Sequence, residues 1–276
     1  MKKTIRITLL LGAVLALGAF LAGCGESGKE EEEGKTSFQI GCMPLNEPAV
    51  QAISDMLKEK GYDMEVVVFD GNNLPAIALK DGSIDGLMLN HLPWIKTFNA
   101  QNGSELVMVK PYMYASIFGL YSSKHDSVAD IPNGGTITIS NDPDNMQRSL
   151  KLLEKVGLIK LGEKKGEFYT TLDIAENKKN LKFSEVETTA TAASYKDVDA
   201  TIAFSSVMKN AGIDAFSYIA DDGQSVNYPT GLVVNKGTEG ETWVKAVLEV
   251  TQSAEFKKKF DEIFQGAYVM YSELEK

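Results

Sequence analysis

The sequence predicts an α/β protein in which amphipathic helices pack on β-sheets. From Ser37 onward, short apolar runs alternate with segments whose apolar residues recur at helical spacing. Several of the apolar runs end in polar residues, as strands do where they meet the loops of an open α/β sheet. With 276 residues, of which 43% are hydrophobic, the chain is long enough for one large core or two smaller ones.

The N-terminus has the composition of a secretory signal. Lys2, Lys3 and Arg6 form a basic region, and the apolar run that follows is too short for a comfortable membrane span and ends in small residues. An uncleaved apolar anchor is the alternative. Export is therefore expected, with residues 1–23 as the signal peptide.

The end of this signal resembles the lipobox of bacterial lipoproteins. The residues Leu21-Ala22-Gly23-Cys24 carry the resemblance. It implies that cleavage leaves Cys24 as a lipidated N-terminus on the extracytoplasmic face of the cell membrane. Two acyl chains suffice for stable anchoring. Residues 24–36 include the charged run "GESGKEEEEGK", which predicts a flexible linker.

The first half of the mature chain predicts alternating strands and helices. The helix expected over 47–61 ends at Gly61, and the short helix over 73–83 ends near Gly82. The strand over 84–90 leads to His91 and to Pro93, which favours a turn. We expect strands over 37–43, 64–70, 84–90 and a strand system over 105–123, with a further helix over 94–103.

The helix expected over 142–157 has clear ends. Asp142 suits the N-cap position, Pro143 suits the first helical position, and Gly157 suits the C-terminal end. Met146, Leu150, Leu153 and Val156 form one apolar face, which we expect to pack against a sheet. The start of such a helix can bind an anion, because its first backbone N–H groups are unpaired.

Arg148 lies inside this helix and has two possible roles. Its guanidinium can add a bidentate fork to an anion bound at the helix start. Alternatively, Arg148 forms a surface ion pair with Asp144, which lies four residues before it. The residues alone leave both roles open.

The rest of the chain continues the α/β pattern. Strands are expected over 135–141, 181–187 and 230–237, and the segment 199–212 predicts a strand followed by a helix. Residues 241–264 predict two terminal helices.

Composition and motifs argue against several classes of protein. The net charge of −10 at pH 7 argues against nucleic-acid binding. The sequence has two histidines and two cysteines, with no zinc-ligand spacing, phosphate-binding glycine loop or hydrolase elbow. We therefore expect no enzyme activity, cofactor or metal. If Cys24 is acylated, Cys42 has no disulfide partner and is expected to be a buried packing residue.

Long stretches of the chain resemble the NlpA lipoprotein family, which contains the methionine-binding lipoproteins of ABC importers. The stretches are "NDPDNMQRSLKLLEKVGLIKL", "TTLDIAENKKNLKFSEVE", "KDGSIDGLMLNHLPW" and "FDGNNLPAIAL". The resemblance implies a two-lobed periplasmic-binding-protein fold, type II-like, with the ligand buried between the lobes. We expect lobe boundaries at 37–117 plus 231–276 and at 118–230. The implied partners are an amino-acid ligand, methionine or a relative, and an ABC permease with its ATPase.

The same resemblance implies a set of ligand-binding residues. Arg148 corresponds to the carboxylate-binding arginine, and Asn145, His91 and Trp94 match neighbouring positions of the family motif. Four further positions differ from the methionine binders. Asn72 and Leu89 stand where two aromatic residues are usual, and Ser206 and Gly231 stand where asparagines are usual, within an uncertainty of one residue. The acid-binding end is retained, whereas the side-chain end and part of the amine end are altered.

Three functions are compatible with these features. The first is a membrane-anchored receptor that delivers methionine, a related amino acid or a short peptide to an ABC permease. The second is an extracytoplasmic enzyme that uses Cys42 or His91, for which the sequence offers no acid or base partner. The third is a lipoprotein of the same fold that binds another carboxylate-bearing solute or acts as an adhesin. Trp94, Tyr112, Tyr114 and Phe118 are candidates to replace the missing pocket aromatics.

Overall fold

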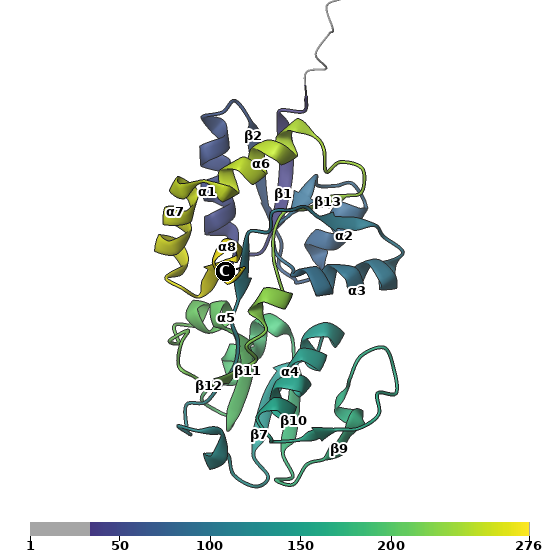
Figure 1. Cartoon of the computed structure of the whole chain (residues 1–276), viewed down its shortest axis with the longest axis vertical. Helices are drawn as coiled ribbons and strands as arrows, with labels where there is room; N and C mark the ends of the chain where they lie inside the picture. Colours follow the sequence, from purple (N-terminus) through teal and green to yellow (C-terminus); the bar gives the residue numbers. More distant parts are fainter. Residues whose placement is uncertain (1–33, 276) are drawn as a thin grey trace, which may run out of the picture. The chain divides into compact units, whose positions relative to one another are not determined.

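The computed structural model describes residues 34–275. The predicted signal peptide, Cys24 and most of the predicted linker lie outside the described residues. Within the described range the chain forms two five-stranded sheets and two smaller two-stranded sheets. We call the first five-stranded sheet with its helices lobe 1, and the second with its helices lobe 2 (Figure 1).

The lobe 1 sheet has the strand order β2-β1-β3-β13-β4. Strands β1, β2 and β3 run parallel, while β13 runs antiparallel to both β3 and β4. The strands are β1 (Ser37–Cys42), β2 (Asp63–Val68), β3 (Gly86–Leu87), β4 (Leu106–Met108) and β13 (Val233–Asn235). The helices are α1 (Glu47–Lys58), α2 (Leu74–Lys80), α3 (Leu92–Asn102), α6 (Thr242–Gln252) and α7 (Ala254–Phe264).

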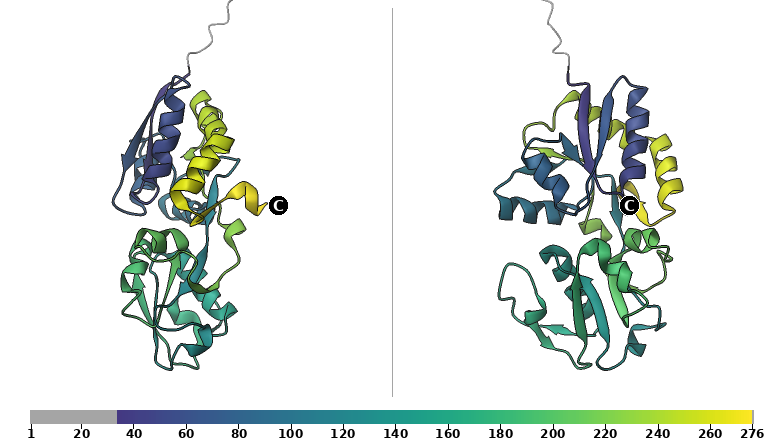
Figure 2. Two further views of the ribbon diagram at one scale, coloured as in Figure 1. Left: turned by 90° about the vertical axis from the view of Figure 1, so that its left-hand side faces the viewer. Right: turned by 180° about the vertical axis from the view of Figure 1, so that it is seen from behind.

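Helices cover both faces of the lobe 1 sheet, and the side chains of its strands alternate between the two cores that result. Val234 and Met88 belong to the core formed with α1, α6 and α7, whereas Val233 and Leu87 belong to the core formed with α2 and α3. Helices α6 and α7 pack beside α1, as Figure 2 also shows. Elements from the two ends of the described chain therefore share one core.

The lobe 2 sheet has the strand order β10-β7-β11-β6-β12, and β6 runs antiparallel to its two neighbours. Helix α4 packs on one face, against Ile137, Ile139 and Ile202, and α5 packs on the other face with Ala203. The strands are β6 (Phe118–Tyr121), β7 (Thr136–Ser140), β10 (Lys182–Val186), β11 (Ala200–Phe204) and β12 (Tyr218–Asp221). The remaining elements are α4 (Pro143–Lys155), α5 (Ser205–Asn210) and the small hairpin of β8 (Lys160–Leu161) and β9 (Ile174–Glu176).

The two lobes are joined by segments that run side by side. Strand β5 (Tyr114–Ser116) is separated from β6 by a single residue, and it pairs with β14 (Tyr268–Met270) near the C-terminus. Thr230, on the return from lobe 2, forms bridges with both His91 and Tyr114. Helix α8 (Tyr271–Leu274) follows β14. These segments bring residues distant in sequence to one place between the sheets.

The structure confirms the α/β class and differs from the predicted elements at several boundaries. The helix expected over 94–103 begins earlier, at Leu92, because the His91 ring accepts a hydrogen bond from the backbone N–H of Trp94 and so caps the helix. The strand system expected over 105–123 is three short strands, which follows from its crossing between lobes. Strands β12 and β14 were not predicted, because each has only a few residues.

Cys42 provides a test of this packing. Its side chain is fully buried in the lobe 1 core, and burial raises the pKa of its thiol to about 12. We expect Cys42 to stay unmodified by a water-soluble thiol reagent in the native Cys24→Ser chain, where it is the single thiol. Reaction should become fast in denaturant. Stoichiometric labelling of the native protein would show that this strand end is open to solvent.

Candidate functional site

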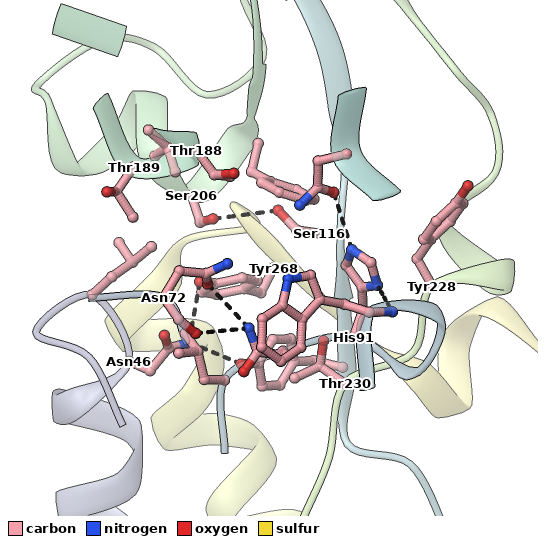
Figure 3. Close-up of a pocket in the computed structure, with 18 of the residues that line it drawn as sticks. Asn46, Asn72, His91, Ser116, Thr188, Thr189, Ser206, Tyr228, Thr230 and Tyr268 are labelled. Carbon is pink, nitrogen blue, oxygen red and sulfur yellow. Dashed lines mark hydrogen bonds between the residues drawn. The ribbon is translucent and has the colours of Figure 1, made fainter. Parts of the chain in front are cut away.

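A cavity of about 70 Å³ lies between loops and strand ends of both lobes. A water needs roughly 10–15 Å³ by the same measure, so the cavity has room for a small solute. Figure 3 shows that side chains from both lobes and from the joining segments point into it. Lobe 1 supplies Asn46, Asn72, Leu89, Asn90, His91 and Trp94, the joining segments supply Tyr114, Ser116, Tyr228, Thr230 and Tyr268, and lobe 2 supplies Asn145, Arg148, Thr188, Phe204 and Ser206.

Arg148 is a buried charge in the wall of this cavity. The residue is 2% exposed, and its guanidinium carbon lies 3.6 Å from the ring centre of Tyr228 and 4.5 Å from that of Phe118. Aromatic faces attract a cation at such distances. Among residues 34–275, neither terminal nitrogen of the guanidinium, Nη1 or Nη2, has a hydrogen-bond partner. Two charged donors are thus left for a group that enters the cavity.

The ion pair of Arg148 is formed with Asp222, which lies just after β12. The Arg148 Nε group donates to Asp222 Oδ2 at 2.6 Å, and the Asp222 side chain is itself 7% exposed. The alternative role of Arg148, a surface pair with Asp144, is therefore wrong. Helix α4 is buried on more than its apolar face, because the polar residues Asn145, Arg148 and Ser149 are buried as well.

His91 and Asn145 connect the two lobes through an ordered chain of hydrogen bonds. His91 Nδ1 accepts from the backbone N–H of Trp94, so the neutral ring carries its proton on Nε2. That Nε2 lies 3.1 Å from Asn145 Oδ1, and Asn145 Nδ2 donates to Asp142 Oδ2. Asp142 also caps α4 by accepting from the backbone N–H of Asn145. The helix cap and the contact between lobes are therefore one network.

Asp144 adds a second contact of His91 at this interface. Its Oδ2 lies 3.6 Å from His91 Nε2 and has no hydrogen-bond partner within the part of the chain that the structure describes. Burial, together with the nearby charge of Asp142, raises the pKa of Asp144 to about 6. Burial and the Arg148 charge lower the pKa of His91 to about 4. At neutral pH this contact joins a carboxylate to an uncharged ring.

The structure places seven of the eight predicted ligand-binding residues in the cavity wall. Asn72, Leu89, Trp94 and Ser206 line it, as do His91, Asn145 and Arg148. Gly231 is not among the lining residues, and its neighbour Thr230 is. Of the proposed replacement aromatics, Trp94 and Tyr114 line the cavity, whereas Phe118 contacts the guanidinium of Arg148.

Sequence reasoning missed several residues of the site. Asp222 lies in a turn-like "DDG" stretch, Tyr228 follows a short 3-10 helix (Ser225–Asn227) and Phe204 ends β11, so no local pattern ties them to Arg148. Asn46 precedes α1 and Asn90 follows β3, which are positions at strand and helix ends where polar ligand groups are common. Their positions at the ends of a helix and a strand could therefore have indicated Asn46 and Asn90 as candidate site residues.

Residues 34–275 contain neither a metal-binding cluster nor a membrane-spanning helix. In this range, no group of three or more His, Cys, Asp or Glu side chains is arranged to hold a metal ion. The helices of the same range are all too short or too polar to cross a membrane.

The Asp144→Asn substitution should change the pH dependence of stability. A carboxyl whose folded pKa is raised stabilises the fold below its unfolded pKa of 3.8, and this contribution is lost as pH rises through about 6. At pH 8 the variant should therefore unfold with a free energy up to about 3 kcal/mol higher than the wild type, and the difference should shrink towards pH 4. Urea unfolding at both pH values measures it.

His91 has the opposite pH dependence in the wild type. Its lowered pKa gives stability that is present above pH 6.5 and is lost as pH falls through about 4. A difference between variant and wild type that is equal at pH 4 and pH 8 would contradict the assignment to Asp144.

Comparison with known proteins identifies relatives along most of the chain. The chain is 33% identical over 262 residues to Lipoprotein 28 of Escherichia coli, covering 93% of this chain and 94% of the relative. It is 33% identical over 256 residues to the D-methionine-binding lipoprotein MetQ of Salmonella typhimurium, covering 90% and 92%. A nutrient binding protein from Burkholderia cenocepacia bound to methionine superposes with a TM-score of 0.76 at 30% identity, over 85% of this chain and 98% of that one. The family model for the NlpA lipoprotein matches residues 38–271, and the chain belongs to this family.

Proposed function

We propose that the protein is a membrane-anchored receptor that binds an amino acid, either methionine or a relative, or a short peptide, and delivers it to an ABC permease. The observation that carries the proposal is that Nη1 and Nη2 of Arg148, buried in the cavity wall, have no hydrogen-bond partner from residues 34–275. A carboxylate accepts two parallel hydrogen bonds from such a fork. The similarity to a methionine-binding lipoprotein and to a methionine-bound structure supports an amino-acid ligand.

Asp222 prepares Arg148 for this role without occupying it. Its carboxylate takes the Nε side of the guanidinium and compensates the buried charge, while the Nη groups remain available. The rings of Phe118 and Tyr228 hold the guanidinium plane in place. The ligand then binds to a group that is already oriented, which limits the entropy lost on binding.

Closure of the two lobes is the proposed signal of occupancy. We take the lobes as residues 37–117 plus 231–276 and residues 118–230, joined at β5–β6 and near Thr230. Lining residues from both sides of these boundaries surround one cavity, so a solute bound there contacts both lobes. Such a solute stabilises the closed form relative to the open one, and a permease can recognise the closed form.

The anchor completes the proposal. The lipobox at Leu21–Cys24 and the names of the relatives support acylation of Cys24 and attachment to the extracytoplasmic face of the membrane. The linker over 24–36 then lets the receptor move above its permease. Catalysis has no part in the proposal, because Nδ1 of His91 accepts from the backbone N–H of Trp94 and Nε2 meets an amide oxygen of Asn145, so neither nitrogen is paired with a hydroxyl or thiol.

Removal of Arg148 tests the receptor function. Wild-type protein, stripped of solute by partial unfolding and refolded, should gain about 3–4 kcal/mol of stability at 100–1,000 times the Kd of its solute. We expect the Arg148→Ala variant to show no such gain with any amino acid. Differential scanning calorimetry against a panel of L- and D-amino acids and methionine dipeptides measures both proteins.

Two controls separate binding from folding. Lys151→Ala, at an exposed position of the same helix, should leave the gain unchanged. The double variant Arg148→Met, Asp222→Asn removes both buried charges together. It should stay folded even if Arg148→Ala unfolds, because it leaves no unpaired buried carboxylate at Asp222. An unchanged gain in this double variant, or no gain for the wild type with any carboxylate-bearing solute, refutes the proposal.

A further inference from the structure

Three asparagines gather in the part of the cavity that lobe 1 forms. Asn46 directly precedes α1, Asn72 lies in the loop after β2, and Asn90 lies after β3. Figure 3 shows Asn46 and Asn72 on one side of the cavity and His91 and Tyr228 on the other. We call Asn46, Asn72 and Asn90 the amide cluster; lobe 1 supplies it, whereas Arg148 comes from lobe 2 and lies against the Tyr228 ring.

The orientation of the Asn90 amide is fixed by its neighbour. Its Nδ2 donates to the backbone oxygen of Asn72 at 3.2 Å and to the side-chain oxygen of Asn72 at 3.0 Å. A backbone oxygen can only accept, so the amide cannot be turned round without placing two oxygens together. Asn90 is 4% exposed, and its Oδ1 has no partner within residues 34–275. This oxygen can therefore accept a hydrogen bond from a solute in the cavity.

Asn46 leaves a second polar atom unpaired. Its Nδ2 lies 2.8 Å from the Tyr114 hydroxyl and 3.2 Å from the Tyr268 hydroxyl, and its Oδ1 has no partner among the described residues. Asn46 is 3% exposed. Burial raises the pKa of Tyr268 to about 12, and it raises the pKa of Tyr114 as well, so both hydroxyls keep their hydrogens at neutral pH. The hydroxyls accept from Asn46 and can donate to a solute.

These groups distinguish between classes of amino-acid side chain. A thioether has no donor and only a weak acceptor, so it would leave the oxygens of Asn46 and Asn90 buried and unpaired. A cationic side chain would add a second buried positive charge to that of the solute's α-ammonium group, and none of the lining side chains in the described range is Asp or Glu. A neutral carboxamide has two N–H groups for the two oxygens and a carbonyl that accepts from a tyrosine hydroxyl.

We propose that the solute is an amino acid with a carboxamide side chain and that Asn46 and Asn90 determine this specificity. The proposal rests on the proposed function, in which Arg148 holds the α-carboxylate. It replaces the broad class of methionine-like amino acids by those whose side chain has a length similar to that of methionine and donates hydrogen bonds. The unpaired oxygens of two nearly fully buried amides carry it.

Glutamine and methionine are matched probes because their side chains are similar in length. With the detergent-solubilised full-length protein, stripped of solute, calorimetric titration should give a Kd for L-glutamine at least tenfold lower than that for L-methionine. Asn90→Leu, which keeps the size of the side chain and removes its oxygen, should weaken glutamine at least tenfold and leave methionine unchanged or tighter. Asn46→Leu changes a different part of the chain and should also weaken glutamine binding without weakening methionine binding. The test can therefore be completed even if one of the two variants misfolds.

The controls separate this proposal from the receptor function. Asn210→Leu, an equal change at an exposed position of α5, should alter neither affinity. If wild-type protein binds methionine as tightly as glutamine, and Asn90→Leu weakens both equally, the oxygens serve the α-amino group and the carboxamide proposal is overturned while the receptor function stands. If no amino acid binds to the wild type, the receptor function itself has failed.

Discussion

The site is organised around the burial of one positive charge, the guanidinium of Arg148. A buried cation is costly unless it is paired and hydrogen-bonded. Asp222 compensates its charge and accepts from Nε, and the rings of Phe118 and Tyr228 lie against it. Nη1 and Nη2 have no acceptor within residues 34–275. Two buried, charged donors therefore lack acceptors in the described part of the chain, and a carboxylate can supply both acceptors.

The start of α4 couples this charge to the contact between the lobes. Asp142 caps the helix and also accepts from Asn145 Nδ2, and Asn145 in turn meets His91 of lobe 1. Because Asn145 and Arg148 lie three residues apart on one helix, a displacement of α4 moves the acid-binding group and the contact between lobes together. In the proposed function, one helix therefore carries both the group that binds the acid and the contact between the lobes.

Sequence patterns predicted the scaffold better than the cavity. The cap at Asp142, the proline at Pro143 and the apolar spacing of α4 are local signals, so that helix was found with its correct ends. Periodicity could not show that Arg148 is buried, because burial depends on the joining segments and on Asp222, which lies 74 residues away. The family resemblance, rather than the pattern, identified Arg148, Asn145 and His91. Asn46 and Asn90 were missed, since their importance comes from tertiary contacts with Asn72, Tyr114 and Tyr268.

In the proposed function, the two ends of the cavity divide recognition between the lobes. The acid-binding group belongs to lobe 2, and the amide cluster belongs to lobe 1. A solute that satisfies one end alone gains little from closure, because the other end keeps its buried, unpaired polar atoms and their cost of about 1–3 kcal/mol each. A solute that satisfies both ends removes that cost only in the closed form. The interactions that select the side chain are thus the same ones that stabilise the closed form. A receptor with this property closes more readily on its correct solute than on another acid.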